Sequence, residues 1–239
     1  MEKDINKKKY SLGDIWISAW NIYKKNFKLF LIISLLIYLP AYIIINLFEE
    51  FSSNLIEINI AYTILSVIIV IIIALIGTYI PLIAIMYSVD KTIKNKQLNY
   101  QEVIKKGFSK FFPAFGTTIL LVIFLIGLFI LLIVPGIIFS IYWYFTIYAV
   151  VLRDKSGKKA LDYSKAVVKK RWWRVLGILL VISLAVGVIT LIINGILLAI
   201  SSHVIIKIIS DTLTSIISIF MMVAATIFFI NLDKVRVKG

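Results

Sequence analysis

Apolar residues in this chain come in long unbroken runs, and the shorter stretches between them carry nearly all of the charge. Most runs are about twenty residues long, the length that an α-helix needs to cross the hydrocarbon core of a bilayer. Because the runs do not alternate apolar with polar positions, a closed β-barrel is rejected. The pattern predicts an all-α integral membrane protein with six transmembrane helices. These are expected at residues 29–48, 61–88, 115–134, 137–152, 175–200 and in a last run that ends near residue 230.

Prolines modify three of these expectations. Pro40 and Pro81 lie inside the first and second runs, where a missing amide hydrogen is expected to bend the helix. The pair Pro135-Gly136 has no charged neighbour, so we expect the chain to reverse there at the far membrane face.

Basic residues are distributed unevenly about the apolar runs. If the N-terminus, the second and fourth connections and the C-terminal tail share one side, that side holds 25 of the 26 lysines and arginines. Only Lys207 remains on the other side. By the positive-inside rule this split predicts that both termini are cytoplasmic, in a multi-pass protein of the cell membrane. Since topology accounts for the net charge of +14, we expect no nucleic-acid partner.

Three basic segments with aromatic residues each precede a pair of runs. In each segment a small residue stands eight positions before an aromatic one: Ala19 and Phe27, Gly107 and Phe115, Ser164 and Trp172. We interpret the segments as amphipathic helices in the headgroup plane, although the first could also be the opening turn of its span. The chain is then one membrane domain, 1–239, built from repeat units at about 11–90, 99–152 and 158–232. Copies related by rotation about the membrane normal make an inverted-repeat transporter less favoured.

The third basic segment is the candidate binding site. Each lysine or arginine near an anionic leaflet contributes about 1 kcal/mol to membrane association, and tryptophan favours the interface. Topology alone is the alternative explanation of this charge. The candidate contacts with anionic phospholipid headgroups are Lys165, Lys169, Lys170, Arg171, Trp172, Trp173 and Arg174.

Catalytic and metal sites find little support. The chain has no cysteine, and its one histidine, His203, stands beside Ser201 and Ser202 in an expected outer loop. A hydroxyl nucleophile needs a base within reach, and a metal site needs three or four ligands. We therefore expect no enzymatic activity, no cofactor and no metal.

Polar residues within the apolar runs have structural interpretations. Lys207 and Asp211 are four residues apart and could form an ion pair on one helix face, with an ion pathway as the alternative. Asn46 and Asn194 are expected to form interhelical hydrogen bonds.

The segment Val134-Pro135-Gly136-Ile137 and the later stretch ALDYSKAVVKKRWWRVLG resemble a known family. The opening SLGDIWISAWNIYKKNFKLF is similar to the start of the same family. This family is the membrane domain joined to some glycerophosphodiester phosphodiesterases, together with its stand-alone prokaryotic relatives. The resemblance implies the fold but no activity, because the phosphodiesterase belongs to a separate soluble domain. The matching residues are Pro135, Gly136, Ala160, Leu161, Ser164, Val168, Trp172, Trp173, Arg174, Val175, Leu176 and Gly177.

Two classes of function remain open from the sequence. One is a non-enzymatic membrane protein that binds lipid headgroups or scaffolds partners through its basic face. The other is a permease, channel or exporter for a small or lipophilic solute or peptide, including a role in self-protection. The second function predicts a water-filled cavity lined by Asn194, Asp211 and Tyr79.

Overall fold

The computed structural model describes residues 10–53, 60–201 and 203–237, and every regular element in these ranges is helical. Six segments are long and apolar enough to cross a membrane, which confirms the predicted fold class at this level. They are Phe27–Glu50, Val67–Ile93, Tyr100–Leu131, Ile133–Arg153, Trp172–Ile200 and Val204–Arg236. The elements are α2 (Leu12–Lys25), α3 (Phe27–Ile33), the π-helix η1 (Ser34–Tyr38), α4 (Leu39–Ser53), α5 (Ile60–Ile93), α6 (Tyr100–Leu131), α7 (Ile133–Tyr142), α8 (Thr146–Arg153), α9 (Lys158–Val168), α10 (Trp172–Ile200) and α11 (Val204–Val237).

Helix α2 begins with a capping box. The Ser11 hydroxyl accepts a hydrogen bond from the amide of Asp14 at 3.1 Å, and the Asp14 carboxylate accepts one from the amide of Ser11 at 2.8 Å. Two otherwise unpaired amides are thereby satisfied. The buried face of the helix consists of Ile15, Ala19, Ile22 and Tyr23. Trp16 and Trp20 are partly exposed and lie beside Phe220 of α11.

The first span is continuous through α3, η1 and α4. A proline cannot donate to the carbonyl four residues before it, and its ring crowds that carbonyl. The π-helical turn Ser34–Tyr38 lies directly before Pro40 and widens the helix at this point. The bend expected at Pro40 therefore takes the form of a π-helical segment.

Helix α6 differs from the expectation for the second repeat. Gly107 and Phe115 lie in one unbroken helix of 32 residues, so the predicted separate interfacial helix is absent here. Asn26 ends α2, but no comparable break separates the basic turns of α6 from its apolar turns, and Pro113 is accommodated inside the helix. Only α2 and α9 stand apart from the spans that follow them.

The reversal after α6 also lies elsewhere than predicted. Leu132 is extended, with φ −157° and ψ 125°, and breaks the helix there. Pro135 lies in the first turn of α7, where the amide hydrogen that proline lacks would have no partner in the helix. The predicted turn at Pro135-Gly136 is therefore wrong by about one helical turn. A second break at residues 143–145 divides the fourth span into α7 and α8.

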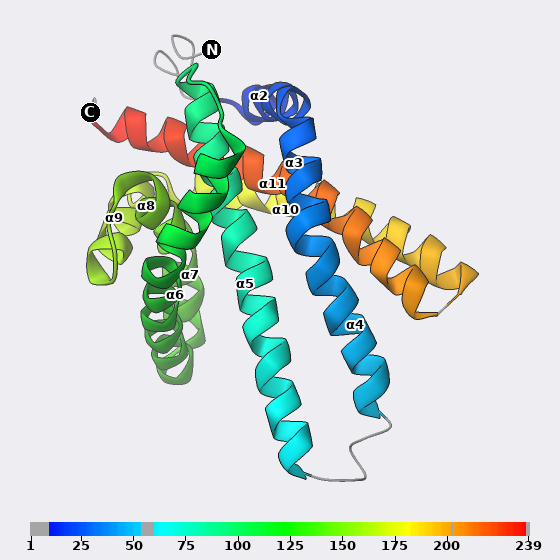
Figure 1. The fold of residues 1–239 in the computed structure, drawn as a ribbon. Coiled ribbons are helices and arrows are strands. Elements are labelled where there is room, and N and C mark those ends of the chain that lie inside the picture. The colour runs from blue at the N-terminus through cyan, green and yellow to red at the C-terminus, as the bar shows by residue number, and fades with distance from the viewer. Residues whose placement is uncertain (1–9, 54–59, 202, 238–239) are drawn as a thin grey trace.

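Helix α11 is the central element of the fold. It contacts α2, α4, α5, α9 and α10. In its most apolar stretch 61% of the residues are buried, compared with 11% in α6. Figure 1 shows three hairpins, α4–α5, α6–α7 and α10–α11, that diverge from a common region, the first two pointing downward and the third to the right. Their outer surfaces are large and apolar, as expected of helices surrounded by lipid.

Two asparagines join the hairpins to α11. Asn46 of α4 donates to Asp211 at 3.0 Å. The side-chain oxygen of Asn194 on α10 accepts hydrogen bonds from Ser210 at 2.5 Å and from Thr214 at 3.2 Å. Both predicted interhelical contacts are confirmed. The predicted Lys207–Asp211 ion pair is wrong, because Asp211 points toward α4 and makes its contact with Asn46 instead.

Gly107 gives a stability test of the α5–α6 contact. A β-carbon at Gly107 would lie 2.8 Å from the Ile80 side chain and 3.0 Å from its backbone oxygen, whereas nothing lies within 4 Å of the same atom at Gly116. We expect Gly107→Ala to lose about 1–3 kcal/mol of stability relative to Gly116→Ala, since both gain the same helix propensity. Thermal melting of the two variants in detergent measures the difference, and equal melting temperatures would contradict the packing.

Candidate functional site

Charged residues from several helices meet at one end of the molecule, called here the charged end. It comprises the last turns of α5 and α11, the first turns of α6 and α10, and the segment from Arg153 through α9. Lys91 of α5 contacts Glu102 of α6 at 2.5 Å, and Lys110 of α6 pairs with Asp154 after α8. The amide of Tyr10 donates to Asn231 of α11 at 3.2 Å, so the start of α2 lies at the same end.

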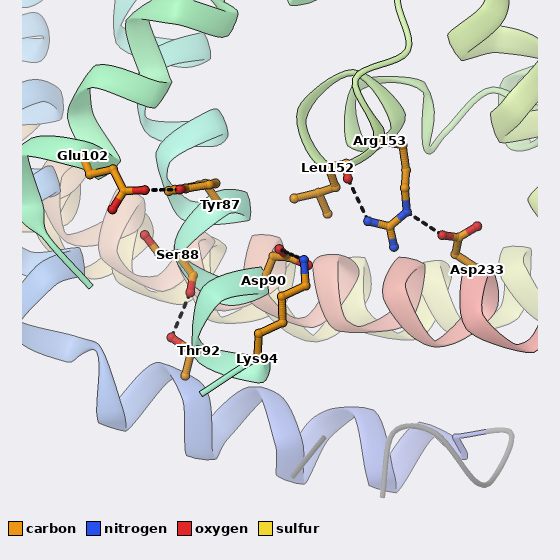
Figure 2. A network of polar contacts seen from close by, with 9 residues as sticks. All are labelled: Tyr87, Ser88, Asp90, Thr92, Lys94, Glu102, Leu152, Arg153 and Asp233. Carbon is orange, nitrogen blue, oxygen red and sulfur yellow. Dashed lines mark hydrogen bonds and ion pairs between the residues drawn. The ribbon is translucent and has the colours of Figure 1, made fainter. Parts of the chain in front are cut away.

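A buried carboxylate organises part of this end. Asp233 of α11, with only 5% of its side chain exposed, accepts from Arg153 at 2.7 Å and from the Tyr163 hydroxyl at 2.6 Å. Arg236 approaches the same carboxylate at 3.6 Å and lies 4.2 Å over the Tyr163 ring. Figure 2 shows Arg153 reaching both Asp233 and the carbonyl of Leu152. These four side chains, called here the Asp233 clamp, join α8, α9 and α11.

Two pKa values outside the spans reflect this packing. Burial raises the pKa of the Tyr163 hydroxyl, and its hydrogen bond to Asp233 raises it further. The hydrogen bond from Lys110 lowers the pKa of Asp154, which supports an ionised Asp154 in the pair that links α6 to the α8–α9 connection. Since the Asp154 side chain is 71% exposed, this pair contributes little to stability.

The seven predicted headgroup contacts lie in residues 165–174, called here the basic junction, which runs from the end of α9 into α10. Three of the seven make hydrogen bonds to backbone carbonyls. The indole of Trp172 donates to Ile138 at 3.1 Å, Arg171 donates to Leu232 at 3.4 Å, and Arg174 donates to Tyr10. These contacts attach the start of α10 to α7, to α11 and to the segment before α2.

The other members of the basic junction show no side-chain hydrogen bond to a described backbone carbonyl. Lys169 and Lys170 are exposed, and 79% of Trp173 is accessible although its ring meets that of Trp172 edge to face at 4.7 Å. Lys165 lies apart from them, with its ammonium group 4.9 Å above the Phe139 ring. A cavity of about 400 Å³ brings five of the seven residues together. Its lining is Lys170, Arg171, Trp172, Trp173 and Arg174.

This arrangement suits an anion at a membrane surface. The cavity lies at the start of α10, where the helix dipole adds partial positive charge to that of the side chains. Guanidinium and ammonium groups bind phosphate oxygens, and an exposed indole favours the headgroup region. Lys165 and Lys169 are not part of the cavity lining. The structure therefore separates the seven predicted headgroup contacts into five that line the cavity and two that do not.

Acid–base chemistry has no comparable arrangement in the described residues. They contain no group of three histidine, aspartate or glutamate side chains placed to hold a metal ion. His203 is exposed, and its Nδ1 accepts from the amide of Ile205 at 3.4 Å at the start of α11. Its neighbour Ser202 lies outside the described part of the chain.

The Asp233 clamp was not predicted. Its sequence signal is a single carboxylate in the basic stretch that ends an apolar helix. Such a carboxylate is costly to bury without cations, so partners from another basic segment could have been sought. No pattern in the sequence identifies Arg153 and Tyr163 as those partners.

No protein-family model, curated protein or solved structure matches the chain. The resemblance to the membrane domain associated with glycerophosphodiester phosphodiesterases therefore stays a prediction.

The Asp233 clamp predicts a large loss of stability from one substitution. Asp233→Asn keeps the shape of the side chain but leaves Arg153 half-buried without its counter-ion, which should cost about 3 kcal/mol. Asp162→Asn removes the same charge from an exposed position on α9 and should leave the melting temperature nearly unchanged. Thermal melting in detergent distinguishes the two variants, and a similar small effect at both positions would show that the clamp is not stabilising.

Proposed function

We propose that this chain is a non-enzymatic, multi-pass protein of the cell membrane that binds the headgroups of anionic phospholipids through its basic junction. The observation that supports this proposal is the cavity at the start of α10, which is lined by three cationic residues together with an exposed tryptophan. Lipid phosphates at the inner leaflet would meet Lys170, Arg171 and Arg174 beside the indole of Trp173. The anchored arginines would orient the cavity, and the free lysines would attract the leaflet.

The proposal requires the charged end to face the cytoplasm. Its support is the uneven distribution of lysine and arginine among the connections, which predicts cytoplasmic termini by the positive-inside rule. The threefold repeat is not needed for it, because α9 and the basic junction form a site by themselves.

The transport alternative has less support. Asn194 and Asp211 each bind a neighbouring helix, and Tyr79 packs against the rings of Phe111 and Phe115 at 6.0 and 6.1 Å. Four cavities of the described residues, those that include Trp16, Ile37, Asn26 and Trp173, contain none of these three predicted lining residues.

Cysteine labelling tests the orientation. Because the chain has no cysteine, single substitutions Lys155→Cys and Ser201→Cys place one thiol near each end of the described hairpins. In intact cells a membrane-impermeant maleimide should label Ser201→Cys, whereas Lys155→Cys should react only after permeabilisation. The reverse result would place the basic junction outside the cell and remove the basis of the proposal.

Liposome flotation tests headgroup binding. The purified chain carrying Lys169→Ala and Lys170→Ala should lose roughly tenfold or more of its preference for phosphatidylglycerol over phosphatidylcholine, since each basic residue contributes about 1 kcal/mol at an anionic surface. These lysines make no contact that holds the fold together, unlike Arg171 and Arg174. Lys158→Ala with Lys159→Ala is the matched control, because it removes the same charge from exposed positions on α9. An equal loss of lipid preference in both variants would show that the lysines attract anionic lipid non-specifically, which would contradict a headgroup site at the basic junction.

A further inference from the structure

A second polar cavity lies at the charged end, between the α2–α3 bend and the connection from α5 to α6. Its volume is about 360 Å³, at the small end of the range for ligand sites. It is lined by Lys25, Asn26, Thr92, Asn95, Lys96, Gln97 and Leu98. No residue of the basic junction takes part, so the cavity is distinct from the headgroup site proposed above.

The floor of this cavity is rigid. Asn26 and Thr92 are 7% and 4% exposed. The side-chain amide of Asn26 donates to the Thr92 hydroxyl at 3.1 Å and to the carbonyl of Ile22 at 2.9 Å. Thr92 in turn donates to the carbonyl of Ser88 at 2.8 Å, the contact drawn in Figure 2. These bonds fix the bend after α2 against the last turn of α5.

The wall contributed by the α5–α6 connection is also held in one shape. Asn95 has a φ of 53°, a left-handed conformation that asparagine tolerates better than most residues. Its amide donates to the carbonyl of Thr92 at 3.1 Å, and the amide of Lys96 donates to that of Lys91 at 3.0 Å. The side chains of Asn95, Lys96 and Gln97 are exposed at the cavity.

The lining of this cavity contains two lysines and no carboxylate. Lys94, the neighbouring lysine, is paired with Asp90 at 2.6 Å. Lys25 and Lys96 form no ion pair with a described residue, although Lys96 interacts electrostatically with Glu102, which is itself paired with Lys91. The two lysines reach the cavity from different elements, and three carboxamide residues, Asn26, Asn95 and Gln97, complete its polar lining.

We propose that this cavity binds a small phosphate ester, with Lys25 and Lys96 holding its phosphate and with the Asn95 and Gln97 amides binding its polar remainder. A phosphate group presents acceptor oxygens on several sides, so it can bind ammonium groups that come from two elements at once. A lipid headgroup and a soluble metabolite offer the same chemistry, and the experiment separates these sources.

The test uses the full chain in phosphatidylcholine nanodiscs and two probes. Calorimetric titration with glycerol 3-phosphate measures the soluble source, and native mass spectrometry after addition of phosphatidic acid measures the lipid source. For whichever probe binds, Lys25→Ala with Lys96→Ala should weaken binding by roughly tenfold for each lysine removed, because each loses a charge-assisted hydrogen bond. Lys158→Ala with Lys159→Ala is the control with the same loss of charge, and it should bind the probe as the unmodified chain does. Lys169→Ala with Lys170→Ala removes charge from the basic junction instead, and it measures how much of the bound probe is held there.

A milder variant keeps the test decisive if the double alanine variant does not fold. Asn95→Gly retains the left-handed conformation while removing the carboxamide, and should weaken binding several-fold without changing the circular dichroism spectrum. The proposal is overturned if neither probe binds, if succinate binds as well as glycerol 3-phosphate, or if Lys158→Ala with Lys159→Ala loses as much affinity as Lys25→Ala with Lys96→Ala. Loss of binding confined to the Lys169 and Lys170 pair would assign the phosphate to the basic junction instead.

Discussion

The arrangement of the charged end depends on the compensation of one buried carboxylate. Asp233 lies near the end of the most buried helix, where an unpaired negative charge would be costly. Arg153, Tyr163 and Arg236 satisfy it from three elements, and this fixes α9 on α11. The basic junction follows α9 directly, so the Asp233 clamp helps to determine where the cavity of the basic junction lies.

Away from the charged end, many apolar side chains of the spans are exposed on the protein surface, where lipid rather than a protein core would cover them. The three hairpins diverge in Figure 1, and among the six candidate spans of the described residues α11 alone has most of its apolar stretch buried. Some polar side chains within the spans are paired across helices, as Asn46 with Asp211 and Asn194 with Ser210. Others, such as Thr212 and Thr226, donate to carbonyls of their own helix. Hydrogen bonds of this kind contribute modestly to stability in a bilayer but specify which faces meet.

The sequence predicted the helices of this fold better than the breaks and turns between them. The six apolar runs followed from composition, because each depends on neighbours in the chain. The break at Leu132 did not, since leucine carries no turn signal and Pro135 was accommodated in the first turn of a helix. At the candidate site, the set predicted from basic and aromatic residues includes all five residues that line the cavity. It could not separate Arg171 and Arg174, which bind backbone carbonyls, from the free Lys170, because those carbonyls belong to distant segments.

The unbroken course of α6 has a mechanical consequence. A helix of 32 residues is about 48 Å long, and α6 runs without a break from its basic first turns to its apolar tip, with Pro113 inside it. Its first turns also border the phosphate cavity through the connection from α5. An unbroken helix moves largely as one body, so a tilt at the charged end would be carried to the far end of α6.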